Sequence, residues 1–472
     1  MLSDNDKIKH LYNRAGFGLK TEDLKTKTDV QSVLQKLFQT DSKYQKMEAV
    51  SLAEVKTAQE KMKNLSKEDK KDLKQLLKEN VFELNNLWLN EMINSEAQLQ
   101  EKMALFWHGH FACRSANPYF DQQYLDIIRK NALGNFGTML LEVSKTPAML
   151  QFLNNQQNKK DHPNENFARE VMELFTLGRG NYTEQDVKEA ARAFTGFGFD
   201  KTGEFKFRVQ QHDYGTKNFL SNSGDFSGED ILKIILEKKE CAYFITKKIY
   251  RFFVNDETDK DIVQQLSEKF YQSGYDIKFL MKEIFTSEWF YMEKNIGVKI
   301  KSPVELMVAM FRTIPTVFKN TDSTLFIQRS LGQILLNPPN VAGWNGSRSW
   351  IDSSSLLFRM RLPQVIYYDK DIDISPKEIT PEMGMQQMKM ANDFVVKLAS
   401  KKLSATTDWS AVIKYFSSSS DILSVITKTI LAKMPDAVAL KCIQNNADNS
   451  TKENQIKSIM IETMSLPDYQ LC

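Results

Sequence analysis

Apolar residues recur at helical spacing along most of the chain, so the hydrophobic pattern predicts a mostly α-helical protein. Apolar side chains that repeat every three to four residues form one face of an amphipathic helix. Clusters of Pro, Gly and Asn, which end helices, separate these segments. The predicted helical segments are 6–94, 96–113, 121–133, 136–153, 164–177, 183–195, 228–288 and 302–336.

The clearest strand signal is a short alternation of polar and apolar residues at Glu204–Val209. It follows the turn-forming run Asp200–Gly203, and this combination is typical of a β-hairpin. Just upstream, Thr183–Asp186 has the spacing of a capping box, which starts a helix. The sequence therefore predicts a multi-helix, bundle-like body with one small antiparallel β-hairpin near residues 197–210.

The length of the chain predicts a second packed unit. At 472 residues it exceeds the ~250–300 residues at which a single hydrophobic core stops growing. We expect a main helical domain at residues 1–375 and a C-terminal helical segment, 376–472, packed on it. Within the main domain, charges of both signs dominate residues 46–79 and predict a solvated helical arm. Residues 96–217 form the candidate site region.

The charge balance argues against nucleic acid as a partner. The chain has 63 basic and 60 acidic side chains and a formal charge of +3, too small for a phosphate-binding footprint. The four cysteines form no Cys-x-x-Cys pair, so neither a zinc ribbon nor a disulfide framework is expected. No transmembrane segment or export signal is visible. The sequence as written predicts a cytoplasmic protein, or an exported one if a leader has been trimmed.

Four passages carry motifs in a fixed order: 11–18 (LYNRAGFG), 106–111 (FWHGHF), 163–174 (PNENFAREVMEL) and 338–344 (PPNVAGW). Together they resemble the bacterial family called domain of unknown function 1800. Similarity at 182–196, 212–217, 301–305 and 466–471 extends the resemblance over nearly the whole chain. Members of this family are often exported and often encoded beside a sulfatase-like family, so the resemblance implies a sulfatase-like protein as a candidate partner. It implies no reaction for named residues.

The histidines are confined to the first half of the chain: His10, His108, His110, His162 and His212. Because histidine is suited to proton transfer near neutral pH and to metal ligation, this distribution indicates a site there. On a helical wheel His110 falls among apolar residues and should face inward, whereas His108 lies on another side. His110 is either a core histidine bonded to a backbone carbonyl or a functional group.

The predicted helix 164–177, here called the carboxylate helix, places four charged side chains on one arc: Glu165, Arg169, Glu170 and Glu173. A solvated helix face explains this arc. Alternatively, the carboxylates line a cleft, where they bind a divalent cation or divide the roles of acid and base. The expected metal ligands are Glu170, Glu173 and His110.

A second group of candidates lies in the turn after the predicted hairpin. His212, Asp213 and Lys217 are displayed on a loop, where functional residues often lie, although they are also ordinary turn and surface residues. Short motifs of common enzyme classes, such as His-Glu-x-x-His and Gly-x-Ser-x-Gly, do not occur in the sequence.

The sequence leaves two functional hypotheses open. The first is an acid–base or metal-assisted hydrolase whose cleft gathers His108 or His110, the carboxylate helix and the His212 loop, with substrate and metal unspecified. The alternative is a non-catalytic helical binding or scaffold protein. Convergence of the side chains favours the enzyme, and dispersal favours the scaffold.

Overall fold

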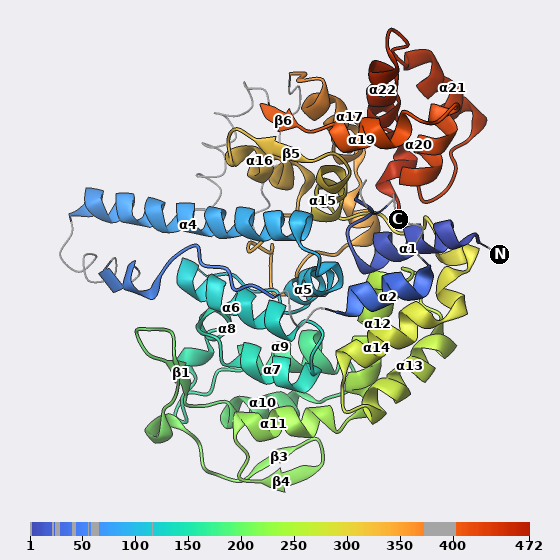
Figure 1. Ribbon diagram of the computed structural model, residues 1–472. Coiled ribbons are helices and arrows are strands. Elements are labelled where there is room, and N and C mark those ends of the chain that lie inside the picture. The colour runs from blue at the N-terminus through green and yellow to red at the C-terminus, as the bar shows by residue number, and fades with distance from the viewer. Residues whose placement is uncertain are drawn as a thin grey trace.

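The computed structural model describes residues 2–20, 23, 29–39, 44–54, 56–57, 66–115, 117–371 and 403–472. Helices dominate it, so the predicted fold class is confirmed (Figure 1). The helices up to residue 193 are α1 (Asp4–Ala15), α2 (Val30–Phe38), α4 (Lys67–Asn94), α5 (Gln98–His110), α6 (Pro118–Asn131), α7 (Phe136–Ser144), α8 (Pro147–Phe152), α9 (Asn166–Glu170), the π-helix η3 (Val171–Thr176) and α10 (Glu184–Ala193).

The remaining helices follow the β-hairpins. They are α11 (Gly228–Leu236), α12 (Lys239–Phe253), α13 (Lys260–Gln272), α14 (Ile277–Thr286), α15 (Pro303–Thr313), α16 (Asp322–Leu331), α17 (Ser353–Tyr367), α19 (Ser410–Phe416), α20 (Ile422–Ile430), α21 (Ala437–Asn446) and α22 (Lys452–Met464). Short 3₁₀ helices are η2 (Asn155–Gln157), η4 (Val209–Gln211), η5 (Glu288–Tyr291), η6 (Glu293–Asn295), η7 (Ser347–Trp350) and η9 (Pro467–Gln470). In Figure 1, α19 to α22 lie together at one end, and α4 projects sideways.

Side-chain caps explain why several helices begin where they do. The predicted capping box of α10 is present, with Thr183 and Asp186 satisfying each other's backbone N–H groups. α11 and α15 begin in the same way, at Ser227 and Ser302. Such caps satisfy amides that a helix start leaves without partners, and each contributes about 1 kcal/mol.

The described residues form three two-stranded antiparallel sheets. The predicted hairpin is one of them, with β1 (Phe197–Phe199) paired to β2 (Phe205–Phe207). The sequence pattern did not predict the second, β3 (Lys217–Phe219) with β4 (Asn222–Gly224). Nor did it predict the third, β5 (Thr316–Phe318) with β6 (Ala405–Thr407), whose strands are far apart in the chain.

A continuous hydrophobic core runs through the molecule from α1 to α22. α5 lies deep within it, and every residue from Gln98 to His108 is buried. Its polar residues therefore need partners inside the protein. Arg129 of α6 provides one, donating to both carboxylate oxygens of the buried Glu101 at 2.7–3.1 Å.

Only some of the predicted helix and domain boundaries can be compared with the structure. The predicted helix 136–153 is divided into α7 and α8, because Pro147 starts a new helix. Residues 55 and 58–65 of the predicted arm at 46–79 lie outside the described residues, and so does the predicted domain boundary near 376. The division into 1–375 and 376–472 stays a prediction. Within the described ranges, no helix combines the length and the apolar character needed to cross a bilayer.

Candidate functional site

The predicted carboxylate helix consists of two kinds of helix. α9 continues directly into η3, where backbone amides donate to carbonyls five residues back, as Leu177 does to Met172 at 2.9 Å. π-helical turns of this kind occur frequently at functional sites. Phe167, Ala168, Val171, Met172 and Phe175 are buried in the core.

Arg169 joins the carboxylate helix to the start of α10. Its guanidinium donates to both oxygens of Glu184, at 2.7 and 2.8 Å, and to Glu165 at 3.0 Å. All three side chains are about one-third exposed or more, so solvent screens these ion pairs and they contribute little to stability. Arg169 and Glu165 are therefore engaged in contact between two helices.

Glu170 and Glu173 have different surroundings on the same helix face. Glu173 accepts from Arg179 Nε at 2.6 Å and from the Tyr182 hydroxyl at 3.2 Å. The Glu170 side chain is half-buried, and its carboxylate forms no hydrogen bond or ion pair with any residue that the structure describes. Burial, and then the charge of Glu173, raise the pKa of Glu170 above its usual value.

His110 lies against the inner side of η3 and is bonded at both ring nitrogens. Nε2 lies 3.0 Å from the carbonyl oxygen of Phe175, and Nδ1 lies 3.1 Å from Nζ of Lys248 on α12. Lys248 also donates to the carbonyl of Leu174 at 2.9 Å. Because lysine only donates, this geometry fits a neutral imidazole that donates from Nε2 and accepts at Nδ1.

Burial dominates the protonation of this pair. It lowers the pKa of His110 well below the usual value, with a further contribution from the charge of Lys248. It also lowers the pKa of Lys248 to about 8, assisted by the charge of Arg251. His110 is buried, as its place on the helical wheel predicted, and it bonds a backbone carbonyl, the contact expected of a core histidine.

His108 has a separate environment on another side of α5. Its Nε2 accepts the backbone N–H of Leu336 at 2.9 Å. Its ring stacks on Trp88, with centroids 5.2 Å apart, and meets Trp344 edge-on at 5.5 Å. Burial lowers the pKa of His108 to about 4. The residue therefore stays neutral and fastens the loop after α16 to α5.

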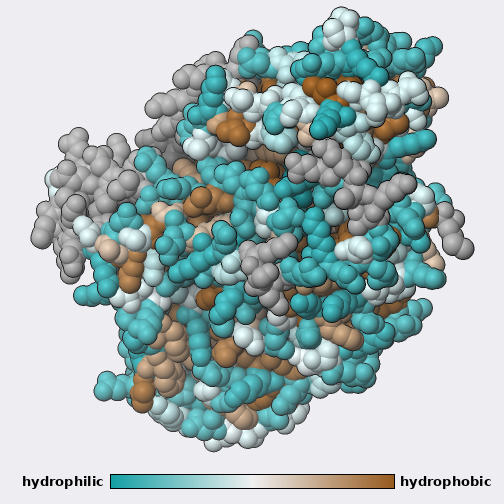
Figure 2. All heavy atoms as spheres, in the orientation of Figure 1, coloured by the Kyte–Doolittle hydropathy of each residue, from teal (hydrophilic) through white to brown (hydrophobic). Residues whose placement is uncertain are grey.

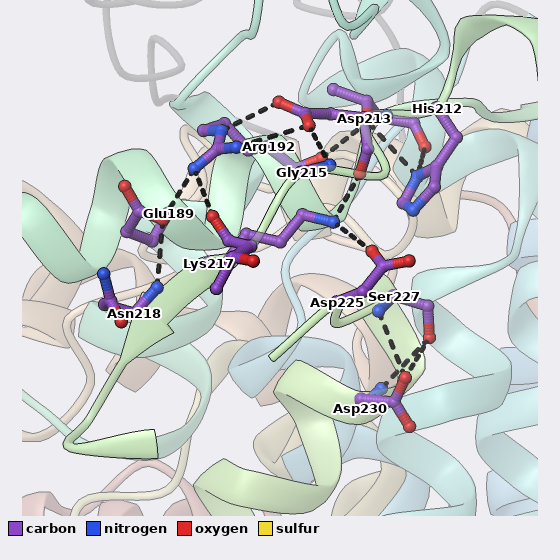
Figure 3. Close-up of polar contacts among 12 residues, drawn as sticks. Glu189, Arg192, His212, Asp213, Gly215, Lys217, Asn218, Asp225, Ser227 and Asp230 are labelled. Carbon is purple, nitrogen blue, oxygen red and sulfur yellow. Dashed lines mark hydrogen bonds and ion pairs between the residues drawn. The ribbon is translucent and has the colours of Figure 1, made fainter. Parts of the chain in front are cut away.

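The His212 loop is fastened to the end of α10 (Figure 3). Arg192 donates to the two oxygens of Asp213 at 2.8 and 3.3 Å and to Glu189 at 2.8 Å. The N–H of Asp213 donates to Thr195 Oγ1 at 2.9 Å, and His212 Nδ1 lies 2.9 Å from the Thr195 carbonyl. Burial alone would raise the pKa of Asp213, but Arg192 lowers it overall.

Lys217 completes this network from the first position of β3. Its ammonium group donates to the Asp213 carbonyl and to Asp225 Oδ1, the latter at 2.9 Å. The Lys217 side chain is fully buried, contrary to the exposed display that its turn position indicated. The network thus connects α10, the loop and the segment after β4 (Figure 3).

The predicted residues form separate contact networks. Glu184, which binds Arg169, begins α10, whereas Arg192, which binds Asp213, lies near its end. At 1.5 Å per residue, the two positions are about 12 Å apart along the axis. His108 contributes to neither network. Among the residues that the structure describes, no hydrogen bond or ion pair joins these groups across a shared cleft.

The geometry also bears on the predicted metal ligands. Among the described residues, no three or more His, Cys, Asp or Glu side chains are grouped so that they could hold a metal ion. Both ring nitrogens of His110 already have partners, and Glu173 is bound to Arg179. The ligand set Glu170, Glu173 and His110 stays a prediction.

Several residues that the structure places in these networks had not been singled out from the sequence. Lys248 occupies an ordinary position in an amphipathic helix, so its spacing carries no signal. Arg192 lies within 182–196, one of the passages that resemble the family, so the resemblance could have indicated this residue. Lys301 likewise begins the passage 301–305 and proves to be buried.

The comparison with protein families covers nearly all of the molecule just described. Residues 10–471 match the family described as "Protein of unknown function (DUF1800)". The chain belongs to this family. Neither a curated protein nor a solved structure matches it. Membership of DUF1800 therefore assigns the chain to a family but does not assign it an activity.

Three of the passages that indicate DUF1800 membership meet in space. Lys301 donates its backbone N–H to the carbonyl of Gln470 at 2.8 Å. Asn13, Lys301 and Tyr469, one from each passage, line the same cavity. The beginning, middle and end of the DUF1800 match thus close around one point in the fold.

Proposed function

We propose that the protein is a non-catalytic helical binding protein that presents an apolar patch on its His212 loop to a protein partner. The single observation that carries this proposal is the exposure of three large apolar side chains within eight residues. Phe207, Val209 and Tyr214 are 38%, 58% and 55% exposed, respectively. Exposed apolar patches on soluble proteins often mark interaction sites. We call these three residues the loop patch.

The loop patch rests on a rigid frame. The buried His212 ring packs against Phe207 at 5.1 Å and Tyr214 at 4.8 Å between centroids. The next residue, Asp213, is held by Arg192 through two hydrogen bonds. A loop that is already ordered loses little conformational entropy on binding, which favours affinity.

The surroundings of the loop patch indicate the chemistry of the partner. Lys160 donates its backbone N–H to Gln211 at 2.8 Å, which places the exposed Lys159 and Lys160 beside the loop. Figure 2 shows apolar side chains gathered at the lower left, over the β1–β2 hairpin, with hydrophilic ones around them. An apolar anchor flanked by carboxylates would complement this surface. The family resemblance suggests a sulfatase-like protein as the source of such a segment.

The networks of the candidate site support binding over hydrolysis. Arg169, Asp213 and Lys217 are occupied by ion pairs within the fold. His108 and His110 are buried and bonded to backbone groups. A catalytic group must instead reach a substrate proton directly or through one water.

Glu170 supports hydrolysis as a second candidate function. Its pKa is raised, and its neighbour Glu173 is paired with Arg179. Two carboxylates with different environments are a familiar basis for dividing acid and base roles. In this version the proton donor is Glu170, and no metal is needed.

Selection from a displayed library of random peptides tests the binding proposal. We expect enriched peptides to combine Asp or Glu with a large apolar residue and to bind the Val209→Ser/Tyr214→Ser variant at least tenfold more weakly. Val317→Ser is the matched control, because Val317 is 71% exposed on β5, away from the loop. Equal binding to all three proteins would exclude the loop patch. A sulfatase-like protein with the same dependence would identify the partner class.

A further inference from the structure

The β1–β2 hairpin has a backbone edge that is free to pair. Within the described residues, β2 pairs with one strand, β1. In an antiparallel pair, alternate residues bond across the ladder, and the residues between them direct their backbone groups outward. Arg208 donates its N–H to the carbonyl of Gly196 at 2.7 Å, and Asp200 donates to that of Glu204 at 3.0 Å. The even-numbered residues of β2 therefore bond to β1, and its odd-numbered residues face outward.

Phe205 and Phe207 are the outward-facing residues of β2. Among the described residues, no hydrogen bond reaches the backbone N–H or C=O of either one. β1 lies against α8 and η2 on its other side, whereas β1 itself is the element in extensive contact with β2 within the described ranges. Figure 1 shows the hairpin at the margin of the molecule. An open strand edge of this kind is a template for a further strand.

One face of the hairpin is aromatic. Phe197 lies opposite Phe207 and Phe199 lies opposite Phe205, so the four rings share this face. Phe207, at 38% exposed, is the most exposed of the four. A strand added beside β2 would extend the aromatic face with an apolar side chain next to Phe207.

The opposite face of the same edge is basic. Lys206 is 50% exposed and pairs with Glu204 and Asp200 of its own hairpin, at 2.9 and 3.6 Å. Arg208 donates to the carbonyl of Gln156 at 3.0 Å and forms no ion pair with any described residue. A charged side chain in the middle of an edge strand discourages indiscriminate pairing. A strand that carries carboxylates on this face avoids that penalty.

We infer that the partner of the loop patch binds as an extended strand along the outer edge of β2 and carries alternating apolar and acidic side chains. Its backbone bonds to Phe205 and Phe207. Its apolar side chains lie beside the loop patch, and its carboxylates lie beside Lys206 and Arg208. In strand addition, backbone bonds give affinity and alternate side chains give specificity. This inference rests on the proposed function, because the loop patch begins at the last residue of β2.

Amide hydrogen exchange of the full chain, with and without the end-blocked heptapeptide Glu-Val-Glu-Tyr-Glu-Val-Glu, tests this binding mode. Without peptide, the amides of Phe205 and Phe207 should exchange quickly, whereas that of Lys206, which faces β1, is already protected. Saturating peptide should slow the two outward amides by about tenfold or more, because each gains a hydrogen bond.

Methylation of alternate peptide nitrogens gives a second readout on the unchanged protein. Only every second N–H of an added strand faces β2, so one set of methyl groups should weaken binding by about tenfold or more and the other set should leave it unchanged. Equal losses from both sets, or no saturable binding of the heptapeptide, would overturn strand addition.

Charge reversal locates the edge. Lys206→Glu should weaken the heptapeptide by about tenfold or more, since it places like charges side by side. Ser223→Glu is the matched control and should bind as wild type does, because Ser223 is exposed on β4, in the other hairpin of this region. Equal affinity of the two variants would contradict the predicted position of the peptide.

This inference and the proposed function fail in different ways. Binding that is lost in Val209→Ser/Tyr214→Ser but leaves the amides of Phe205 and Phe207 unprotected would overturn strand addition and retain the loop patch. Protection of these amides by a peptide that binds Val209→Ser/Tyr214→Ser as tightly as wild type would retain the strand and exclude the loop patch.

Discussion

Lys217 and Asp225 form an ion pair in which one side chain is fully buried and the other is 52% exposed, with Nζ and Oδ1 2.9 Å apart. The two partners therefore depend on the contact to different degrees. If Lys217 is lost, water can solvate the Asp225 carboxylate. If Asp225 is lost, the Lys217 ammonium group keeps only the carbonyl of Asp213.

This asymmetry predicts that Asp225→Ala costs more stability than Lys217→Met. Asp225→Ala should lower the free energy of unfolding by about 3 kcal/mol, the usual cost of leaving a buried charge unpaired. Lys217→Met should cost about 1 kcal/mol, because an apolar side chain replaces the buried charge. Urea denaturation of both variants measures the difference. Equal costs, or the reverse order, would contradict the assignment of Lys217 as a buried charge.

Acid should destabilise the protein through His108. Its pKa is about 4 in the folded state and about 6.5 when unfolded, so the unfolded state binds more protons between these values. Stability therefore falls as the pH falls from 6.5 toward 4, by up to about 3 kcal/mol. Denaturation at pH 7 and pH 4.5 should show a smaller pH effect in His108→Gln than in wild type. His162→Gln, at an exposed position, should retain the wild-type dependence.

Lys248 should make stability rise with pH in the alkaline range, in the same direction that His108 gives at acid pH. Its pKa falls from 10.5 in the unfolded chain to about 8 in the folded protein, so the unfolded state again binds more protons. Stability gains about 1–2 kcal/mol as the pH rises from 8 to 10, after allowance for partial exposure. The gain should be absent from Lys248→Met, which will also lose the contact with His110. A parallel pH dependence in the two proteins would show that Lys248 is not titrating there.

Replacing Glu170 separates a candidate acid from an ordinary surface residue. The folded state raises its pKa, so its ionisation opposes folding above that value. Glu170→Gln should therefore be as stable as wild type, or up to about 1 kcal/mol more stable at pH 7, and equal to it at pH 4.

Glu173→Gln provides the control for Glu170→Gln. This variant weakens contacts with Arg179 and Tyr182 and should cost about 0.5–1 kcal/mol at pH 7. A loss of stability in Glu170→Gln as large as this would mean that Glu170 has a structural partner.

Local sequence signals predicted the local features of this fold. The capping box at Thr183 and the hairpin at 197–210 depend on residues a few positions apart, and both are present. The pairing of β5 with β6 brings together strands that are 87 residues apart in the chain, from Phe318 to Ala405. Periodicity cannot predict such a pairing, and it was missed. Short-range patterns carry no information about such contacts.

The candidate site shows the same limit. The helical wheel placed His110 inward correctly, because apolar residues surround it in sequence. It could not predict that Glu101 and His108, on another side of α5, are also buried, since the cover comes from other helices. The partners that decide the roles of these residues, such as Lys248 for His110 and Arg129 for Glu101, are distant in the chain.

The π-helix η3 has a consequence for how the length of this segment can vary among relatives. Removing one residue from 171–176 would restore α-helical hydrogen bonding, in which each carbonyl accepts from the amide four residues later. The carbonyls of Leu174 and Phe175 would then be withdrawn from Lys248 and His110. A relative with the shorter segment should therefore have lost this lysine and histidine as well, so that a single deletion and two substitutions are inherited together.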